Sequence, residues 1–244
     1  MEERKTIYLC LAHMSDEGWE QKYVKEAFDT NWVVPMGPNV NVFEQNLADF
    51  ANACSDGSKL DRKVVCLSAG TAAVHLALIA CGVQSGDEVC VQSFTFCASS
   101  HPITYLGAKP VFIDSERETW NMDPEILEKA ILDRKEKTGK YPKAIIPVAL
   151  YGMPYDCEKI MAVANKYNIP VIEDTAEGMG SRFDGQVLGT FGRFGVLSFN
   201  GNKMITTSGG GALICRNDED ANNIMWHATQ ARDAYPYYQH TEIG

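Results

Sequence analysis

The sequence predicts an α/β domain with a mixed, mostly parallel β-sheet flanked by helices. Short apolar runs alternate with amphipathic segments over most of the 244 residues, which is the pattern of parallel strands connected by helices. Nearer the C-terminal end, two apolar runs follow each other without a helix between them, so we expect consecutive strands there. The hydrophobic content of 45% and the charged content of 22% are those of an ordinary globular protein.

Residues 63–175 supply strands and helices in turn. The clearest helix limits are those set by Asp123 and Pro124, which suit an N-cap and a first turn, and by Gly139, which ends the helix. Another helix is marked by apolar residues at helical spacing: Ala73, Leu76, Ala77 and Ala80. We expect strands at 63–67, 87–94, 109–114, 143–150 and 170–175, and helices at 70–82, 95–107, 124–138 and 156–168.

A loop containing a lysine separates the two consecutive strands, which we place at 193–200 and 210–216. A helix at 218–231 follows, and the chain then runs on as an aromatic coil. No internal repeat, low-complexity tract or clear linker divides the sequence. We therefore treat residues 1–244 as one domain.

Composition excludes several classes of function. A net charge of -10 argues against a nucleic-acid partner, and no window offers the roughly 18 apolar residues that a membrane helix needs. The charged start MEERKTIYLC lacks the features of a signal peptide, so we expect a cytoplasmic protein. The eight cysteines include no CxxC pair and the five histidines no HxxxH pair; we expect reduced, buried thiols and no metal site.

The lysine loop, SFNGNKMITTSGGGAL, contains a single lysine, Lys203, ahead of hydroxyl residues and three glycines. It fails the phosphate-loop pattern because Gly195 and Gly201 have the wrong spacing, Asn202 precedes the lysine and Met204 follows it. No G-x-G-x-x-G follows the first strand either, so a Rossmann dinucleotide fold is not supported. The lysine needs another explanation.

A helix start at SAGTAA, around Gly70 and Thr71, offers free backbone N–H groups and a hydroxyl to an anion such as a phosphate. The alternative is an ordinary helix start. Glu173 and Asp174 stand at the carboxyl end of a predicted parallel strand, where open α/β sheets bind ligands. For this pair the alternative is a solvated turn.

Taken together, the lysine, the strand-end carboxylate and the helix start match the needs of pyridoxal phosphate. This cofactor requires a lysine for a Schiff base, a carboxylate for its ring nitrogen, and amides and hydroxyls for its phosphate. An aromatic ring that stacks on the cofactor would complete the set. Phe94 and Phe96 stand just beyond a predicted strand. We expect Phe94 to pack in the core, and core packing is the weaker alternative for Phe96.

These segments also carry a resemblance. The order SAGTAA, SFTFCAS, PVALYG, IEDTAEGMGS and GTFGRFGVLSFNGNKMITTSGGGAL closely resembles the DegT/StrS family of pyridoxal-phosphate-dependent sugar aminotransferases, and the likeness spans residues 30–235. It implies the large domain of the aspartate-aminotransferase-like fold, known as fold type I. Within the family, the sequence is most similar to enzymes that aminate C4 of a UDP-linked 4-keto-6-deoxy-N-acetylglucosamine.

The resemblance assigns roles residue by residue. It makes Lys203 the Schiff-base lysine and proton shuttle. Some members carry histidine there and catalyse dehydration, so the lysine points to amino transfer. Asp174 would pair with the ring nitrogen, and Glu177 would lie near the ring hydroxyl. The remaining expected contacts are Gly70, Thr71 and Ser198 at the phosphate, Phe96 on the ring, and Asn31 and Trp32 at the sugar nucleotide.

The implied reaction moves an amino group from an amino acid, glutamate in most of the family, to a nucleotide-linked keto sugar. A dTDP-linked or GDP-linked sugar or a keto-cyclitol remains an alternative substrate, and a non-catalytic cofactor-binding or regulatory protein an alternative class. The family forms homodimers and carries a smaller C-terminal domain. Since this sequence stops at Gly244, we expect that domain to be absent and catalysis to be poor without it.

Overall fold

The computed structural model describes residues 14–244. The segment 1–13, which contains Cys10 and on which the signal-peptide argument rests, lies outside the described residues. Within 14–244, no helix is both long and apolar enough to cross a bilayer.

The strands form a mixed sheet in which β9 alone runs against the others among the described residues. A three-stranded sheet of order β3-β2-β4 and a four-stranded sheet of order β1-β9-β8-β5 are joined by parallel bridges from Ile145 to Val171 and from Val148 to Asp174. The strands are β1 (Lys63–Leu67), β2 (Glu88–Gln92), β3 (Lys109–Ile113), β4 (Ala144–Ile146), β5 (Ile172–Asp174), β8 (Phe194–Ser198) and β9 (Gly211–Cys215).

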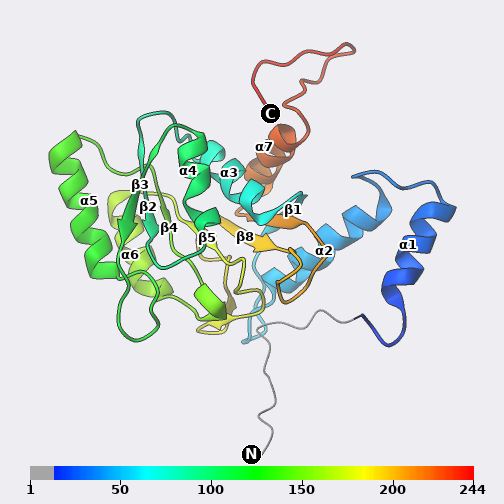
Figure 1. Ribbon diagram of the computed structural model, residues 1–244, viewed down its shortest axis with the longest axis horizontal. Helices are drawn as coiled ribbons and strands as arrows, with labels where there is room; N and C mark the ends of the chain where they lie inside the picture. Colours follow the sequence, from blue (N-terminus) through cyan, green and yellow to red (C-terminus); the bar gives the residue numbers. More distant parts are fainter. Residues whose placement is uncertain (1–13) are drawn as a thin grey trace, which may run out of the picture.

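The helices cover both faces of this sheet (Figure 1). Buried side chains of α3, α4 and α7 pack against one face, whereas α5 and α6 cover part of the other and α2 covers the rest. The helices are α1 (Trp19–Asp29), α2 (Pro38–Asn52), α3 (Gly70–Ala80), α4 (His101–Tyr105), α5 (Pro124–Thr138), α6 (Cys157–Tyr167) and α7 (Asp218–Ala228). The expected α/β architecture, a mostly parallel sheet between helices, is confirmed.

Local signals place several helix ends. The Asp123 carboxylate accepts hydrogen bonds from the first-turn N–H groups of α5, and Gly139 ends that helix at a φ of 76°, as predicted. Asp156 caps α6 and Asn217 caps α7 in the same way. These three helices begin where their own sequence dictates, and α5 also ends there.

Three predicted elements are wrong in their extent. The expected helix at 95–107 is a short 3-10 turn, Cys97–Ser99, followed by α4, because Pro102 lacks an N–H and fits only the first turn of a helix. The strand expected to reach Leu150 ends at Ile146, ahead of Pro147. The last helix ends at Ala228, since Gln230 and Ala231 have positive φ.

Other elements were not predicted. Neither α1 nor α2 was expected, nor the small hairpin of β6 (Arg182–Phe183) and β7 (Gln186–Val187). Helix α1 carries the aromatic residues Trp19, Tyr23 and Phe28, the first two at helical spacing, but it has no buried residue and stands apart from the sheet (Figure 1). The cysteines within 14–244 are free as expected, but Cys97 is exposed, and Cys54 and Cys66 are half-buried.

Candidate active site

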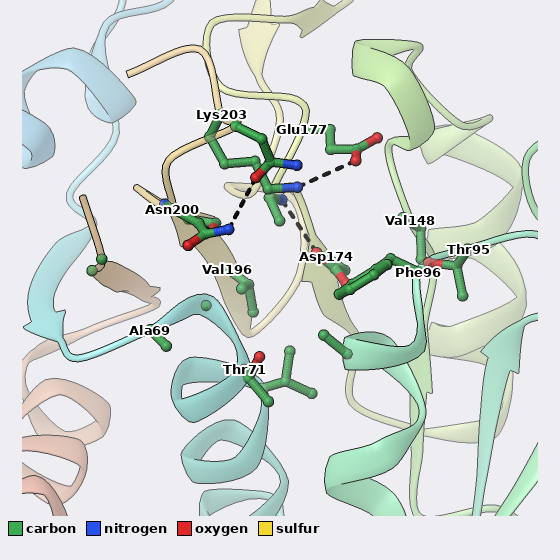
Figure 2. Close-up of a pocket in the computed structure, with 18 of the residues that line it drawn as sticks. Ala69, Thr71, Thr95, Phe96, Val148, Asp174, Glu177, Val196, Asn200 and Lys203 are labelled. Atoms are coloured by element: carbon green, nitrogen blue, oxygen red, sulfur yellow. Dashed lines mark hydrogen bonds and ion pairs between the residues drawn. The ribbon is translucent and has the colours of Figure 1, made fainter. Parts of the chain in front are cut away.

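A cavity of about 450 Å³ opens where the parallel strands end. It lies at the carboxyl ends of β1, β2, β4, β5 and β8, because Ser68, Thr95, Val148, Asp174 and Ser198 all line it. The start of α3 and the lysine loop complete its wall (Figure 2). Volumes of 300–1,000 Å³ are typical of small-molecule sites.

Lys203 extends from a loop whose base is tied by backbone hydrogen bonds. Phe199 N donates to Gly210 O at 2.9 Å, and Thr207 N donates to Phe199 O at 3.0 Å. Phe199 is itself buried and packs on the Phe43 ring, so the loop is anchored in the core. Lys203 N donates to Asn200 O at 3.0 Å, and the lysine side chain turns back into the cavity (Figure 2).

Glu177 holds the lysine ammonium. Its Oε1 lies 3.2 Å from Lys203 Nζ, and its Oε2 accepts a hydrogen bond of 2.8 Å from Tyr151 N. Tyr151 makes that bond from a left-handed backbone conformation with φ 53°, which costs energy in a residue other than glycine. The carboxylate is thus fixed between a cation and a strained backbone amide.

Asp174 ends β5 with its carboxylate in the cavity wall (Figure 2). Ser99 Oγ donates to Asp174 Oδ2 at 2.6 Å, and Ala176 N donates to Oδ1 at 3.2 Å. Burial raises the pKa of Asp174, and this rise is opposed by the Ser99 hydrogen bond, by the Ala176 N–H and by the Lys203 charge. A buried carboxyl of this kind can hold a proton on a ligand nitrogen.

Glu173, the other carboxylate of the pair, points to the opposite face of β5. Successive strand side chains alternate, and Glu173 accepts backbone hydrogen bonds from Gly189, Phe191 and Gly192 at 2.7–2.9 Å. It is fully buried, and burial raises its pKa against those three bonds. The solvated-turn alternative is therefore wrong for both carboxylates, and Glu173 serves the fold rather than the cavity.

The start of α3 points at the cavity without a side-chain cap. Its N-cap residue, Ala69, cannot cap, whereas α5, α6 and α7 are all capped by side chains. Thr71 and Ser198 place hydroxyls in the same wall. A Cβ on Gly70 would lie 3.0 Å from Ser198 Cβ, so β8 and α3 meet closely here. Uncapped N–H groups beside two hydroxyls suit an anion.

The glycine run brings β9 against this helix start. A Cβ on Gly211 would lie 2.4 Å from the Ala69 carbonyl carbon, a distance that no side chain permits. Gly209 and Gly210 line the cavity. The backbone of β9 therefore passes close to the start of α3 beside the cavity.

Aromatic rings gather at the mouth of the cavity. Phe96 lines it beside Asp174 (Figure 2) and is 66% exposed, which suits a ring that covers a ligand. The expectation that Phe94 packs in the core is wrong, because Phe94 is 44% exposed. Its ring instead contacts Trp120 and Tyr151 at 6.1 and 6.5 Å between centroids.

The chain matches known proteins throughout the described residues. The DegT/DnrJ/EryC1/StrS aminotransferase family matches residues 15–244. The chain belongs to this family. EpsN of Bacillus subtilis, whose name assigns it provisionally to the pyridoxal phosphate-dependent aminotransferases, is 48% identical over 98% of the chain and 59% of EpsN. GDP-perosamine synthase of Caulobacter vibrioides is 40% identical over 93% of the chain and 57% of that enzyme.

A solved structure shows the same likeness at the level of the fold. NtdA from Bacillus subtilis, determined with the bound cofactor PMP, superposes with a TM-score of 0.80 at 27% identity, over 95% of this chain and 49% of NtdA. The chain thus spans about half to three fifths of the length of these family members.

Two of the residues expected at the site do not reach it. Asn31 and Trp32 follow α1, and neither lines the cavity. Trp32 packs its ring against Gly37, where a Cβ would lie 2.6 Å from the indole. Their role toward a sugar nucleotide stays a prediction.

Sequence reasoning missed three residues that hold the carboxylates of the cavity wall: Thr95, Ser99 and Tyr151. Ser99 bonds to Asp174, Thr95 bonds to Ser99 at 2.8 Å, and Tyr151 N bonds to Glu177. Ser99 and Asp174 are 75 residues apart in the chain, so no local pattern could have paired them. The positive φ of Tyr151 has no signal in its residue type either.

Proposed function

We propose that residues 1–244 are the cofactor-binding large domain of a pyridoxal-phosphate-dependent sugar aminotransferase. One observation supports this above the others. Lys203 Nζ and the Asp174 carboxylate line the same cavity as the uncapped start of α3. An amine, a carboxylate and an anion site are the three groups that pyridoxal phosphate requires.

The residues present fit this cofactor. The N–H groups at the start of α3, with the Thr71 and Ser198 hydroxyls, would hold its phosphate. Asp174 would hold the ring nitrogen, and Glu177 would lie toward the ring hydroxyl. Phe96 would cover the ring and exclude water from one side.

When bound, pyridoxal phosphate supplies a carbonyl that carries the amino group and a ring that withdraws electrons. Lys203 acts as the base and acid, because its Nζ can take a proton from the amino donor and return it to the amino acceptor. Glu177, at 3.2 Å, holds that nitrogen in place between the two transfers. Asp174 would hold a proton on the ring nitrogen of the bound cofactor, because a carboxylate nearby favours the charged form of that nitrogen.

For the substrates, we propose a nucleotide-linked 4-keto-6-deoxy sugar, with UDP as the carrier, and glutamate as the amino donor. The motif likeness to enzymes that act on a UDP-linked sugar supports this choice. A GDP-linked sugar is the main competitor, because a relative with 40% identity is named GDP-perosamine synthase.

We also propose that the protein acts as a homodimer that covers the mouth of the cavity. Large apolar side chains are exposed at the cavity and on the segments next to it, and exposed apolar clusters mark interfaces. Phe96 lines the cavity, Phe94 contacts Trp120 and Tyr151, and Met204 and Ile205 follow Lys203 in the lysine loop; all six are exposed. Sedimentation at several protein concentrations measures the oligomeric state, and a monomer throughout would contradict this part of the proposal.

The first experiment tests cofactor attachment. Purified protein is mixed with pyridoxal phosphate, its absorbance is recorded, and the adduct is reduced with borohydride and located by mass spectrometry. We expect label on Lys203 and no band in Lys203→Ala. Lys159→Ala is the matched control, because Lys159 lies on the surface and pairs with Asp156. No band in the wild-type protein would overturn the proposal.

The second experiment tests amino transfer. Glutamate and UDP-linked, GDP-linked or dTDP-linked 4-keto-6-deoxy sugars are supplied to the 244-residue protein, and the keto acid product is measured. The same assay on a chain extended by the C-terminal part of EpsN tests whether a further domain is needed. Cofactor attachment without transfer in either protein would favour a non-catalytic cofactor-binding protein.

A further inference from the structure

A pair of hydroxyl groups lies behind the candidate catalytic carboxylate. Ser99 is 1% exposed, and its Oγ lies 2.6 Å from Asp174 Oδ2. Thr95 Oγ1 lies 2.8 Å from the same Ser99 oxygen. Both hydroxyls come from the segment after β2, and the packing of the sheet brings this segment next to the end of β5.

The direction of these hydrogen bonds follows from proton counting. An ionised carboxylate only accepts, and a serine hydroxyl has one proton to donate. Ser99 therefore donates to Asp174, and Thr95 donates to Ser99. The result is a short chain of hydroxyls directed at the carboxylate, with Thr95 at the wall of the cavity and Ser99 buried.

This chain fixes one side of the carboxylate. Asp174 Oδ2 is engaged by the shorter bond, whereas Oδ1 receives the longer one, 3.2 Å from Ala176 N. Oδ1 is thus the oxygen with more capacity left for a ligand. The backbone of Asp174 is also held, because its N donates to Pro147 O and its O accepts from Ala149 N.

We propose that Ser99, oriented by Thr95, is a positioning residue that keeps the Asp174 carboxylate ionised and turned so that Oδ1 can bind the cofactor ring nitrogen. The consequence for the ring rests on the proposed function, whereas the consequence for Asp174 itself does not. A proton shared between the two groups would stay on the ring nitrogen, because the hydrogen bond from Ser99 disfavours protonation of the carboxylate.

The charges around Asp174 support this role. Burial raises the pKa of Asp174, and Glu177 raises it further, while Ser99, Ala176 N–H and Lys203 lower it. Lys203 is paired with Glu177, and the negative charge of Glu177 weakens the effect of the lysine charge on the pKa of Asp174. Ser99 is thus the side chain that most directly offsets burial of the carboxylate.

The test begins with the cofactor-free protein. Carboxyl carbons of aspartate are labelled with carbon-13, the Asp174 signal is assigned by its loss in Asp174→Asn, and it is titrated in wild type, Ser99→Ala and Ser99→Thr. We expect a higher pKa of Asp174 in Ser99→Ala and recovery in Ser99→Thr. Ser100→Ala is the matched control, since Ser100 Oγ bonds only to Cys97 O among the described residues. An unchanged titration in a folded Ser99→Ala protein would overturn the proposal.

A second variant tests the same hydrogen-bond chain at a partly exposed position, where a substitution disturbs folding less than at the buried Ser99. Thr95→Val keeps the shape of a partly exposed side chain and removes the donor to Ser99, so we expect a smaller rise in the pKa of Asp174. With pyridoxal phosphate added, Ser99→Ala should bind the cofactor but transfer amino groups roughly tenfold more slowly, about the factor carried by one hydrogen bond to a charged group. Ser99→Ala activity equal to wild type would contradict the proposal. Absence of cofactor binding in wild type, with the Asp174 titration still altered by Ser99→Ala, would refute the proposed function alone.

Discussion

Replacing Asp174 by Asn should stabilise the cofactor-free protein while impairing its chemistry. Asp174 is 6% exposed, and burial raises its pKa above the ordinary value of 3.8. The folded protein therefore binds more protons than the unfolded chain as the pH rises past that value. The folded protein is fully stable, with respect to this group, while the carboxyl is neutral below about pH 3.8. That stability is lost as the pH rises through the raised pKa, because the buried carboxyl then becomes charged. Asparagine has no charge to bury.

The contacts of Asp174 permit this exchange at little structural cost. The asparagine oxygen can accept from Ala176 N as Oδ1 does. The asparagine NH₂ can donate to Ser99 Oγ, because the Ser99 and Thr95 hydroxyls can then reverse their direction. A rise of one unit in the pKa of the carboxyl corresponds to about 1.4 kcal/mol in the free energy of unfolding, or about 3–6 °C in the melting temperature of a chain of this size.

Thermal unfolding by circular dichroism, after removal of any bound pyridoxal phosphate, measures this gain at about pH 4 and about pH 8. We expect Asp174→Asn to melt above wild type at the higher pH and the two to converge at the lower. Asp49→Asn, at an exposed position of α2, is the control and should show no such dependence. An Asp174→Asn protein that is less stable at about pH 8, or a gain that does not vary with pH, would refute the reasoning.

Replacement of Glu173 by Gln should lower the free energy of unfolding in urea by about 1–3 kcal/mol, because the amide NH₂ would face a buried backbone N–H that now donates to the carboxylate; a variant as stable as wild type would contradict that role. Gly211→Ala should lower the free energy of unfolding in urea by about 1–3 kcal/mol, because its Cβ would be forced against Ala69. Gly209→Ala is the control, since nothing lies within 4 Å of its Cβ. Equal losses in the two variants would contradict the role given to the contact with Ala69. Thr71→Val should weaken pyridoxal phosphate binding roughly tenfold in a fluorescence titration, and unchanged affinity would remove this hydroxyl from the phosphate site.

Local chemistry made part of this protein readable in its sequence. Helix α5 begins at Pro124 and ends at Thr138 as predicted, because its N-cap, its first-turn proline and its final glycine act within a few residues. Lys203, Gly70 and Thr71 were also identified in advance, and they line one cavity. Residue type limits what can perform each of these roles, so the sequence alone was enough to nominate them.

Long-range packing decided the rest. The alternation of β5 side chains and the position of that strand in the sheet turned Asp174 to the cavity and Glu173 to the loop at 189–192. The exposure of Phe94 and the absence of Asn31 and Trp32 from the cavity wall likewise depend on neighbours distant in the chain. The sequence by itself determined which groups could do the chemistry. Only the tertiary structure decided that Ser99 meets Asp174 across 75 residues, because contact between distant segments is set by how the whole sheet and its helices pack.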